Sequence, residues 1–359
     1  MLARRGFTTS SIFVILFLLL AGTANLATAK TLPLPKNNEQ NGNFVRQGFA
    51  DLVERVRPSV VNISTRTHPS STFKNRERSD SVQSPQPGMP HDRSELDKLI
   101  QRFFGPGPYR QQNRATQSLG SGFIIAPEGL IVTNWHVING ADEINVVLDD
   151  GRTLAAILRG KDKKTDLAVL KIDAGAPLPY VRFGDSASAR VGDWVIAIGN
   201  PFGLGGTTTS GIISARGRNI DSGPYDDYIQ IDAPLNRGNS GGPLFNTAGE
   251  VIGVNSAIFS PTGGNVGIGF AIPAALASSI IRELRSTGEV RRGWLGVQIQ
   301  PVTTAIAKSF QRNKAGGVLV SKVVPTSPAE DAGLKIGDII LRFNDIAVRR
   351  VRQLQRTVM

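Results

Sequence analysis

The feature that most constrains the fold is a series of short apolar segments, separated by glycine-rich turns, between residues 120 and 254. The segments start at Phe123, Leu130, Ile144, Leu167, Trp194, Ile212, Tyr228 and Val251. Asp150-Gly151 after the third segment indicates a hairpin. Many short strands at near-regular spacing predict a sandwich or a barrel, so the expected fold is mainly β. One helix follows, from Pro273 to Gly288, with Leu276, Ile280 and Leu284 on one face.

The composition and the missing motifs exclude several types of catalytic and binding site. The 359 residues include no cysteine, which excludes disulfides, thiolate nucleophiles and cysteine-bound zinc. No H-E-x-x-H or phosphate-binding loop motif is present, so neither a metal nor another cofactor is expected. The net charge is +12, or 12 − 2 = +10 without residues 1–29, and would suit an anionic membrane surface, although dispersed surface charge without a partner is the favoured interpretation. Nucleic acid is not an expected partner, because the basic residues are dispersed and aromatic residues make up only 6%.

The first 29 residues resemble an export signal. Arg4 and Arg5 precede an apolar run at 12–21, and Ala27-Thr28-Ala29 has the small-x-small pattern of a cleavage site. A membrane anchor is the alternative, but spanning a bilayer takes about 20 apolar residues. Residues 1–29 are therefore predicted to be a signal peptide cleaved after Ala29, and residues 30–43 the start of the mature chain.

Two domains are expected after this segment. The first covers residues 44–288 and begins with a short helix, carrying Phe49, Leu52 and Val56, that leads into a strand. Within it, residues 66–118 are poor in apolar side chains and predict a long loop. A smaller unit covers residues 291–359 and closes with a helical pattern of Val351, Leu354 and Val358.

The candidate nucleophile is Ser240, in the sequence Gly238-Asn239-Ser240-Gly241-Gly242. Flanking glycines allow a tight turn that exposes the hydroxyl and aims backbone N–H groups of Gly238 and Ser240 at an oxyanion. A glycine-rich turn with a purely structural role is the alternative. Serine also needs a base before it can act as a nucleophile.

His136 is the candidate base, because the other two histidines, His68 and His91, lie in the predicted loop. Asp166 opens an apolar strand and could hold the second ring nitrogen of His136. Its alternative is an aspartate in a surface turn, which is the expectation for Asp162. The order His, Asp, Ser matches the chymotrypsin-type triad rather than the subtilisin or α/β-hydrolase order.

The motifs that carry these residues resemble those of the HtrA family of Do-like bacterial serine proteases. They lie at residues 133–137, 165–169, 199–203, 236–242 and 267–273. The resemblance implies a chymotrypsin-like double β-barrel followed by a partial PDZ domain at 291–359. It implies a periplasmic endopeptidase that acts in stress response and protein quality control on unfolded polypeptides, and a homotrimer with contacts from Phe44 and Phe49.

The same resemblance implies the substrate-binding residues. The strand beside the substrate would run from Gly267 to Phe270, and Ile258 and Phe270 would line an apolar specificity pocket. Residues 66–118 would be a regulatory loop, and residues 216–227 a loop that senses activation. The full set of implied binding residues is Asn239, Ser256, Ala257, Ile258, Phe259, Gly267, Ile268, Gly269, Phe270, and, in the PDZ domain, Leu295, Gly296 and Val297.

Two features depart from the family pattern. Trp135 precedes the candidate base where relatives have a smaller or polar residue, and the sequence stops within the first PDZ domain. We therefore expect the apolar face of the last helix to be uncovered. A binding protein that holds unfolded chains with little turnover is the alternative function.

Overall fold

The computed structural model describes residues 48–67, 116–199, 206–236, 238–260 and 264–358. The predicted signal peptide, the mature segment 30–43, Phe44, and residues 68–115 of the predicted loop lie outside the described residues.

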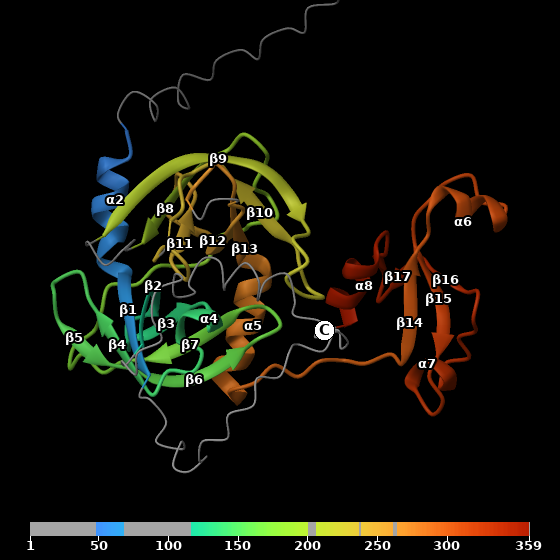
Figure 1. Cartoon of the computed structure of the whole chain (residues 1–359), viewed down its shortest axis with the longest axis horizontal. Coiled ribbons are helices and arrows are strands. Elements are labelled where there is room, and N and C mark those ends of the chain that lie inside the picture. The colour runs from blue at the N-terminus through green and yellow to red at the C-terminus, as the bar shows by residue number, and fades with distance from the viewer. Residues whose placement is uncertain (1–47, 68–115, 200–205, 237, 261–263, 359) are drawn as a thin grey trace, which may run out of the picture. The chain divides into compact units, whose positions relative to one another are not determined.

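Helix α2 (Ala50–Val56) and a 3-10 turn (Arg57–Ser59) lead into a seven-stranded antiparallel sheet (Figure 1). Its strand order is β5-β4-β1-β2-β3-β7-β6. The strands are β1 (Val60–Thr67), β2 (Thr116–Ala126), β3 (Leu130–Thr133), β4 (Glu143–Val147), β5 (Thr153–Ala155), β6 (Ile157–Asp162) and β7 (Leu167–Lys171). Because Thr67 pairs with Thr116, β1 and β2 extend into both ends of the segment predicted as loop.

Six later strands form a closed barrel in the order β10-β13-β12-β11-β8-β9. Its strands are β8 (Trp194–Gly199), β9 (Thr207–Arg218), β10 (Tyr228–Ile231), β11 (Pro243–Phe245), β12 (Val251–Ile258) and β13 (Gly269–Pro273). Because the barrel is closed, the backbone edges of its strands are paired with neighbouring strands. The interior includes Ile213, Ile231, Leu244 and Ile252, all at most 2% exposed.

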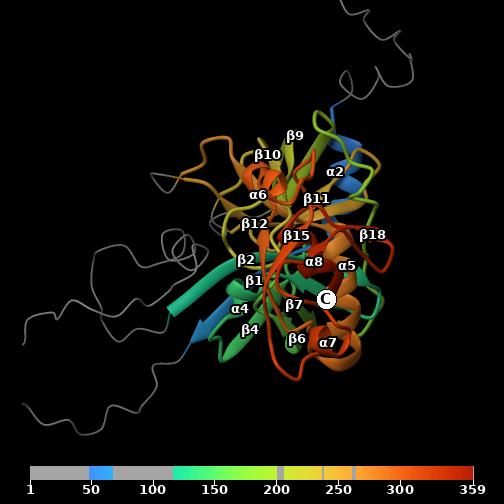
Figure 2. The same ribbon diagram turned by 90° about the vertical axis from the view of Figure 1, so that its right-hand side faces the viewer.

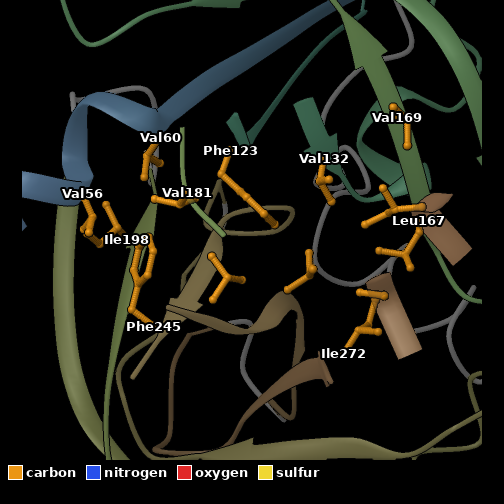
Figure 3. Packing of buried hydrophobic residues seen from close by; sticks show 14 of the residues in the cluster. Val56, Val60, Phe123, Val132, Leu167, Val169, Val181, Ile198, Phe245 and Ile272 are labelled. Atoms are coloured by element: carbon orange, nitrogen blue, oxygen red, sulfur yellow. The ribbon is translucent and has the colours of Figure 1, made fainter. Parts of the chain in front are cut away.

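The sheet and the barrel share one hydrophobic core (Figure 3). Phe123 and Leu167 enter it from the sheet, and Ile198, Phe245 and Ile272 enter it from the barrel. Helix α5 (Ala274–Thr287) adds Ala277, Ile280, Ile281 and Leu284. The prediction of a mainly β fold is thus confirmed, and so is the helix that ends at Gly288.

A second group of elements follows (orange to red in Figures 1 and 2). It comprises β14 (Val297–Pro301), α6 (Thr304–Ser309), β15 (Val318–Val323), α7 (Pro328–Asp331), β16 (Ile339–Ile340), β17 (Arg342–Phe343), β18 (Ile346–Ala347) and α8 (Val351–Val358). Strands β14, β15 and β16 form one sheet, with β14 at its edge.

Helix α8 packs on this small sheet through Leu354, which is 1% exposed and clusters with Val318 and Val348. The expectation that the apolar face of this helix is uncovered is therefore wrong, because β15 and the residue after β18 supply its packing partners. Within the described part of the chain, no helix has the length and apolar character that crossing a bilayer requires.

Candidate active site

His136 and Asp166 meet where the seven-stranded sheet ends. His136 lies in the single turn α4 (Trp135–Ile138), directly after β3, and Asp166 immediately precedes β7. The two strands are paired, which brings both residues to one edge. His136 Nδ1 lies 2.7 Å from Asp166 Oδ2, and the His136 N–H donates to Asp166 Oδ1 at 3.0 Å. Their side chains are 3% and 1% exposed.

Asp166 is held by its backbone as well as by its carboxylate. Its φ of 55° lies in the left-handed region, which is uncommon for a residue other than glycine. The Asp166 carbonyl accepts hydrogen bonds from Asn134 Nδ2 at 2.8 Å and from the Trp135 N–H at 3.2 Å. These contacts maintain a strained conformation that aims the carboxylate at the imidazole. Asn134 was not predicted to have this role, although it lies in the motif that contains His136.

Ser240 joins this pair through Ser256 of β12. The Ser240 hydroxyl donates to the Ser256 carbonyl at 3.0 Å, and the Ser256 hydroxyl donates to Asp166 Oδ2 at 3.0 Å. Ser240 and Ser256 are 5% and 3% exposed. The structure thus brings the three predicted catalytic residues together, with Ser256 in contact with both the nucleophile and the carboxylate. Ser256 was predicted only as a substrate-binding residue.

The turn around Ser240 is anchored to the seven-stranded sheet by Ser121 of β2. Ser121 Oγ donates to the Gly238 carbonyl at 2.6 Å, and the Ser121 N–H donates to the Ser240 carbonyl at 2.9 Å. Gly238 and Gly241 have φ values of 98° and 85°. A Cβ on Gly241 would lie 2.2 Å from the Ser121 carbonyl oxygen, so this close approach requires glycine. The oxyanion roles of Gly238 and Ser240 stay predictions.

Strands β12 and β13 carry the predicted substrate-binding residues of the barrel. Ala257 pairs with Phe270, and Ile258 pairs with Gly269. Ile258 and Phe270 are 4% and 7% exposed, whereas Phe259 is 51% exposed. Gly267 and Ile268 precede β13, which begins at Gly269, and the Phe259 N–H donates to the Ile268 carbonyl at 3.0 Å. Asn239 is buried in the Ser240 turn.

Leu295 and Gly296 immediately precede edge strand β14, which begins at Val297. The Leu295 carbonyl accepts from the Ala329 N–H at 2.9 Å, and the Gly296 carbonyl accepts from the Val324 N–H at 2.8 Å. Gly296 has a φ of 80°, and a Cβ there would lie 2.2 Å from the Ser327 Cβ. The loop before β14 is therefore held in one shape by its neighbours.

The expectation that Asp162 is a surface residue is wrong. Asp162 is 7% exposed, accepts a hydrogen bond from Thr165 Oγ1 at 2.6 Å and forms an ion pair with Arg292. The Arg292 guanidinium lies 4.8 Å from the centre of the Tyr225 ring. Arg292 is distant in sequence, so the partner that covers Asp162 was not evident from the local pattern. Near the candidate base, Lys163 lies over the Trp135 ring at 5.3 Å.

The described residues contain no group of three or more histidine, aspartate or glutamate side chains placed to hold a metal ion.

Comparison with known proteins confirms the predicted chymotrypsin-like protease fold followed by a PDZ domain. Residues 120–254 match the family model of the trypsin-like peptidase domain, and residues 293–359 match that of the PDZ domain. The probable periplasmic serine endoprotease DegP-like of Brucella suis is 47% identical over 357 residues, which cover 91% of this chain and 68% of that protein. The chain belongs to the HtrA family of DegP-like serine endoproteases.

Other members of the HtrA family extend this comparison. The protein of the same description from Bartonella henselae is 49% identical over 323 residues, which cover 87% of this chain and 63% of the relative. The chain therefore spans less than two thirds of the length of this relative. A solved structure of the HtrA-type protease AlgW with a decapeptide is 40% identical, with a TM-score of 0.66 over 87% of this chain and 90% of the other.

Proposed function

We propose that this HtrA-family chain is a serine endopeptidase with Ser240 as nucleophile, His136 as general base and Asp166 as the group that orients the base. The observation that carries the proposal is the connected arrangement of these residues. His136 and Asp166 are joined at 2.7 Å, and Ser256 contacts both Asp166 and Ser240 at 3.0 Å. Family membership supports the same chemistry.

The proposed mechanism starts when the Ser240 hydroxyl turns from the Ser256 carbonyl to His136 Nε2. His136 takes the hydroxyl proton as the Ser240 oxygen bonds to the scissile carbonyl carbon, and the imidazolium is stabilised by Asp166. The N–H groups of Gly238 and Ser240 stabilise the oxyanion. His136 then gives its proton to the leaving amine, and water hydrolyses the acyl-enzyme by the same route.

The proposed substrates are unfolded or misfolded polypeptides that bind in extended form beside β13, near Gly267 to Phe270. Ile258 and Phe270 bring an apolar character to the neighbouring strands, which favours cleavage after Val, Ala, Ile or Thr. The decapeptide in the related AlgW structure supports peptide binding in general. The proposal includes no cofactor.

The test is turnover of casein, an unfolded model substrate, by the wild-type chain and by Ser240→Ala, with product ends mapped by mass spectrometry. Loss of cleavage in Ser240→Ala by at least about a thousandfold is expected, because the hydroxyl forms the acyl-enzyme. Product ends dominated by Lys or Arg would contradict the apolar specificity. Equal cleavage by both proteins would contradict the assignment of Ser240.

A second function is favoured by one observation. The Ser240 hydroxyl donates its hydrogen bond to the Ser256 carbonyl, and this orientation does not prepare the hydroxyl for attack on a substrate carbonyl. A chain resting in this state would hold unfolded polypeptides without cleaving them. In the casein experiment, suppression of aggregation by the wild type without any cleavage would support this function instead.

The proposed domain organisation is a signal peptide at 1–29 cleaved after Ala29, a mature segment at 30–43, a protease domain at 44–288 with a regulatory loop at 66–118, and a partial PDZ domain at 291–359. In the PDZ domain, Leu295 and Gly296 lead into edge strand β14, which begins at Val297, and these three residues are proposed to accept a peptide by strand addition. The names of the relatives support location in the periplasm.

The proposed assembly is a homotrimer. The net charge is +12 for the whole sequence and 12 − 2 = +10 once Arg4 and Arg5 leave with the signal peptide, and this charge supports association with an anionic membrane surface. The Phe49 and Trp194 rings lie 5.8 Å apart, and Trp194 is 41% exposed, so this pair offers an aromatic contact for assembly. Light scattering of the wild type is expected to give the mass of a trimer. A stable monomer would contradict this assembly.

A further inference from the structure

We propose that Trp135 and Lys163 form a positioning pair for the triad, in which the lysine side chain holds the Asp166 turn against helix α4. The Asp166 turn is residues 163–166, which link β6 to β7, and α4 contains His136. This inference rests on the proposed protease function. It also gives a role to Trp135, one of the two features by which the sequence departs from the family pattern.

The backbone of α4 supplies two donors to Asp166. Trp135 and His136 are the first two residues of this helical turn, and the first N–H groups of a helix have no partner within it. The Trp135 N–H donates to the Asp166 carbonyl at 3.2 Å, and the His136 N–H donates to Asp166 Oδ1 at 3.0 Å. A shift of the Asp166 turn away from α4 would break both bonds and move the carboxylate from its place beside the imidazole.

The Asp166 turn needs a restraint from outside itself. Asp166 has a φ of 55°, and this left-handed conformation costs free energy for a residue with a Cβ atom. The hydrogen bond within the turn, from the Asp166 N–H to the Lys163 carbonyl, is long at 3.4 Å. A contact between the first residue of the turn, Lys163, and α4 therefore opposes relaxation of the turn.

Lys163 makes that contact with its side chain. Its Nζ atom lies 5.3 Å from the centre of the Trp135 ring, within the range of a cation–π interaction, and tryptophan is the aromatic residue that binds cations best. The neighbouring carboxylate of Asp162 pairs with Arg292, which leaves the lysine ammonium to the ring. Trp135 is half-buried and Lys163 is exposed, so the indole offers a fixed surface to a lysine that is otherwise free to move.

Trp135 thus contacts the turn at both of its ends. Its N–H binds the carbonyl of Asp166, the last residue of the turn, and its ring binds the side chain of Lys163, the first. A residue without an aromatic ring at position 135 would keep the first contact and lose the second. The side chain of Trp135 therefore adds a restraint on Asp166 that the backbone alone does not provide.

The first test compares Lys163→Met with Lys164→Met in peptide hydrolysis. Lys164 is the next residue of the same turn and is also exposed, so both variants remove one charge from the same place. Lys163→Met should lower kcat about two- to fivefold with little change in KM, because the pair acts on the triad and not on substrate binding. Lys164→Met should match the wild type, and so should Lys163→Arg, because a guanidinium also stacks on an indole. Equal losses in Lys163→Met and Lys164→Met would overturn the inference.

Amide exchange measures the same restraint without turnover. The chain has three tryptophans, so protein containing isotopically labelled tryptophan gives three backbone amide signals, and Trp135→Leu identifies that of Trp135. The Trp135 N–H donates to the Asp166 carbonyl, so its exchange should be about two- to fivefold faster in Lys163→Met and unchanged in Lys164→Met. Unaltered exchange of this amide in Lys163→Met would overturn the inference.

A double-mutant cycle separates the pair from a general effect on folding. In the background of Trp135→Leu, Lys163→Met should cause no further loss of kcat, because the ring is already absent. A full additional loss there, or a raised KM with unchanged kcat in Lys163→Met, would show that the lysine acts by another route and would overturn the inference. If the wild type and Ser240→Ala do not differ in turnover, the protease proposal fails, while exchange of the Trp135 amide still decides whether the pair holds the turn.

Discussion

At the scale of single residues, the Asp166 carboxylate, which we propose orients the base, accepts hydrogen bonds from three donors. Asp166 accepts from the backbone N–H and the ring of His136 and from the Ser256 hydroxyl, and it is 1% exposed. A buried charge without such partners would be costly, so these three donors allow an ionised carboxylate inside the protein.

Gly241 should be intolerant of a side chain. In Gly241→Ala the added Cβ would meet the Ser121 carbonyl oxygen at 2.2 Å and Thr133 Oγ1 at 2.3 Å, at a φ of 85°. We expect the free energy of unfolding to fall by about 1–3 kcal/mol, because alanine is strained in this conformation. Peptide hydrolysis should be lost, because the Ser240 turn must move. Thermal unfolding and a peptide assay measure both effects.

Gly264→Ala is the matched control, since no atom lies within 4 Å of its added Cβ and the residue is exposed. Equal stability and activity of Gly241→Ala and Gly264→Ala would show that the close packing of the Ser240 turn is not required.

The triad could be predicted from the sequence because each of its three members lies in a distinctive sequence motif. In addition, the chain has only three histidines from which to choose the base. The sequence did not predict the bond between Ser256 and Asp166, which are separated by 90 positions and meet only in the folded chain. Asp162 was misassigned for a similar reason, since Arg292 covers it from 130 positions away.

At the scale of elements, the sequence predicted where strands occur better than where they end. Strand β9 runs from Thr207 to Arg218, although only its central part is apolar. Its backbone pairs with both β8 and β10, and this pairing stabilises polar ends that propensity alone would assign to loops. The same explanation applies to the last residues of β1 and the first residues of β2, which pair with each other beyond the apolar sections of these strands.

The end of helix α5 offers a test of local structure. Gly288 caps the helix with a φ of 80°, and its N–H donates to the Leu284 carbonyl. Gly288→Ala should lower the free energy of unfolding of the protease domain by about 1 kcal/mol, because alanine is strained in this conformation. Gly288→Asn should cost less, since asparagine tolerates the left-handed region better. Denaturant unfolding would contradict this if both variants matched the wild type.

At the scale of the whole molecule, two aspartates should give opposite contributions to the pH dependence of stability. Burial raises the pKa of Asp227 above its ordinary value of 3.8, although Arg356, Arg216 and Arg350 attract its charge. Asp150 is exposed, and hydrogen bonds from the backbone N–H and side chain of Arg152 lower its pKa. Opposite shifts at two sites allow the sign of each contribution to be tested in one protein.

For Asp227, the folded state binds more protons than the unfolded state between pH 3.8 and its raised pKa. Stability therefore falls as pH rises through that window, and the cost of the buried charge is fully present at neutral pH. Asp227→Asn should accordingly be more stable than the wild type at pH 7.

Asp150 contributes to the free energy of unfolding with the reverse sign, since its contribution is present above pH 3.8 and is lost as pH falls through its lowered pKa. Asp150→Asn should be less stable than the wild type at pH 7, by a small amount because the pair is exposed. Denaturant unfolding at pH 7, and at the lowest pH at which the wild type stays folded, measures both differences. Each should shrink at the lower pH. A lower stability of Asp227→Asn at pH 7 would show that the attraction of Arg356 outweighs the cost of burial.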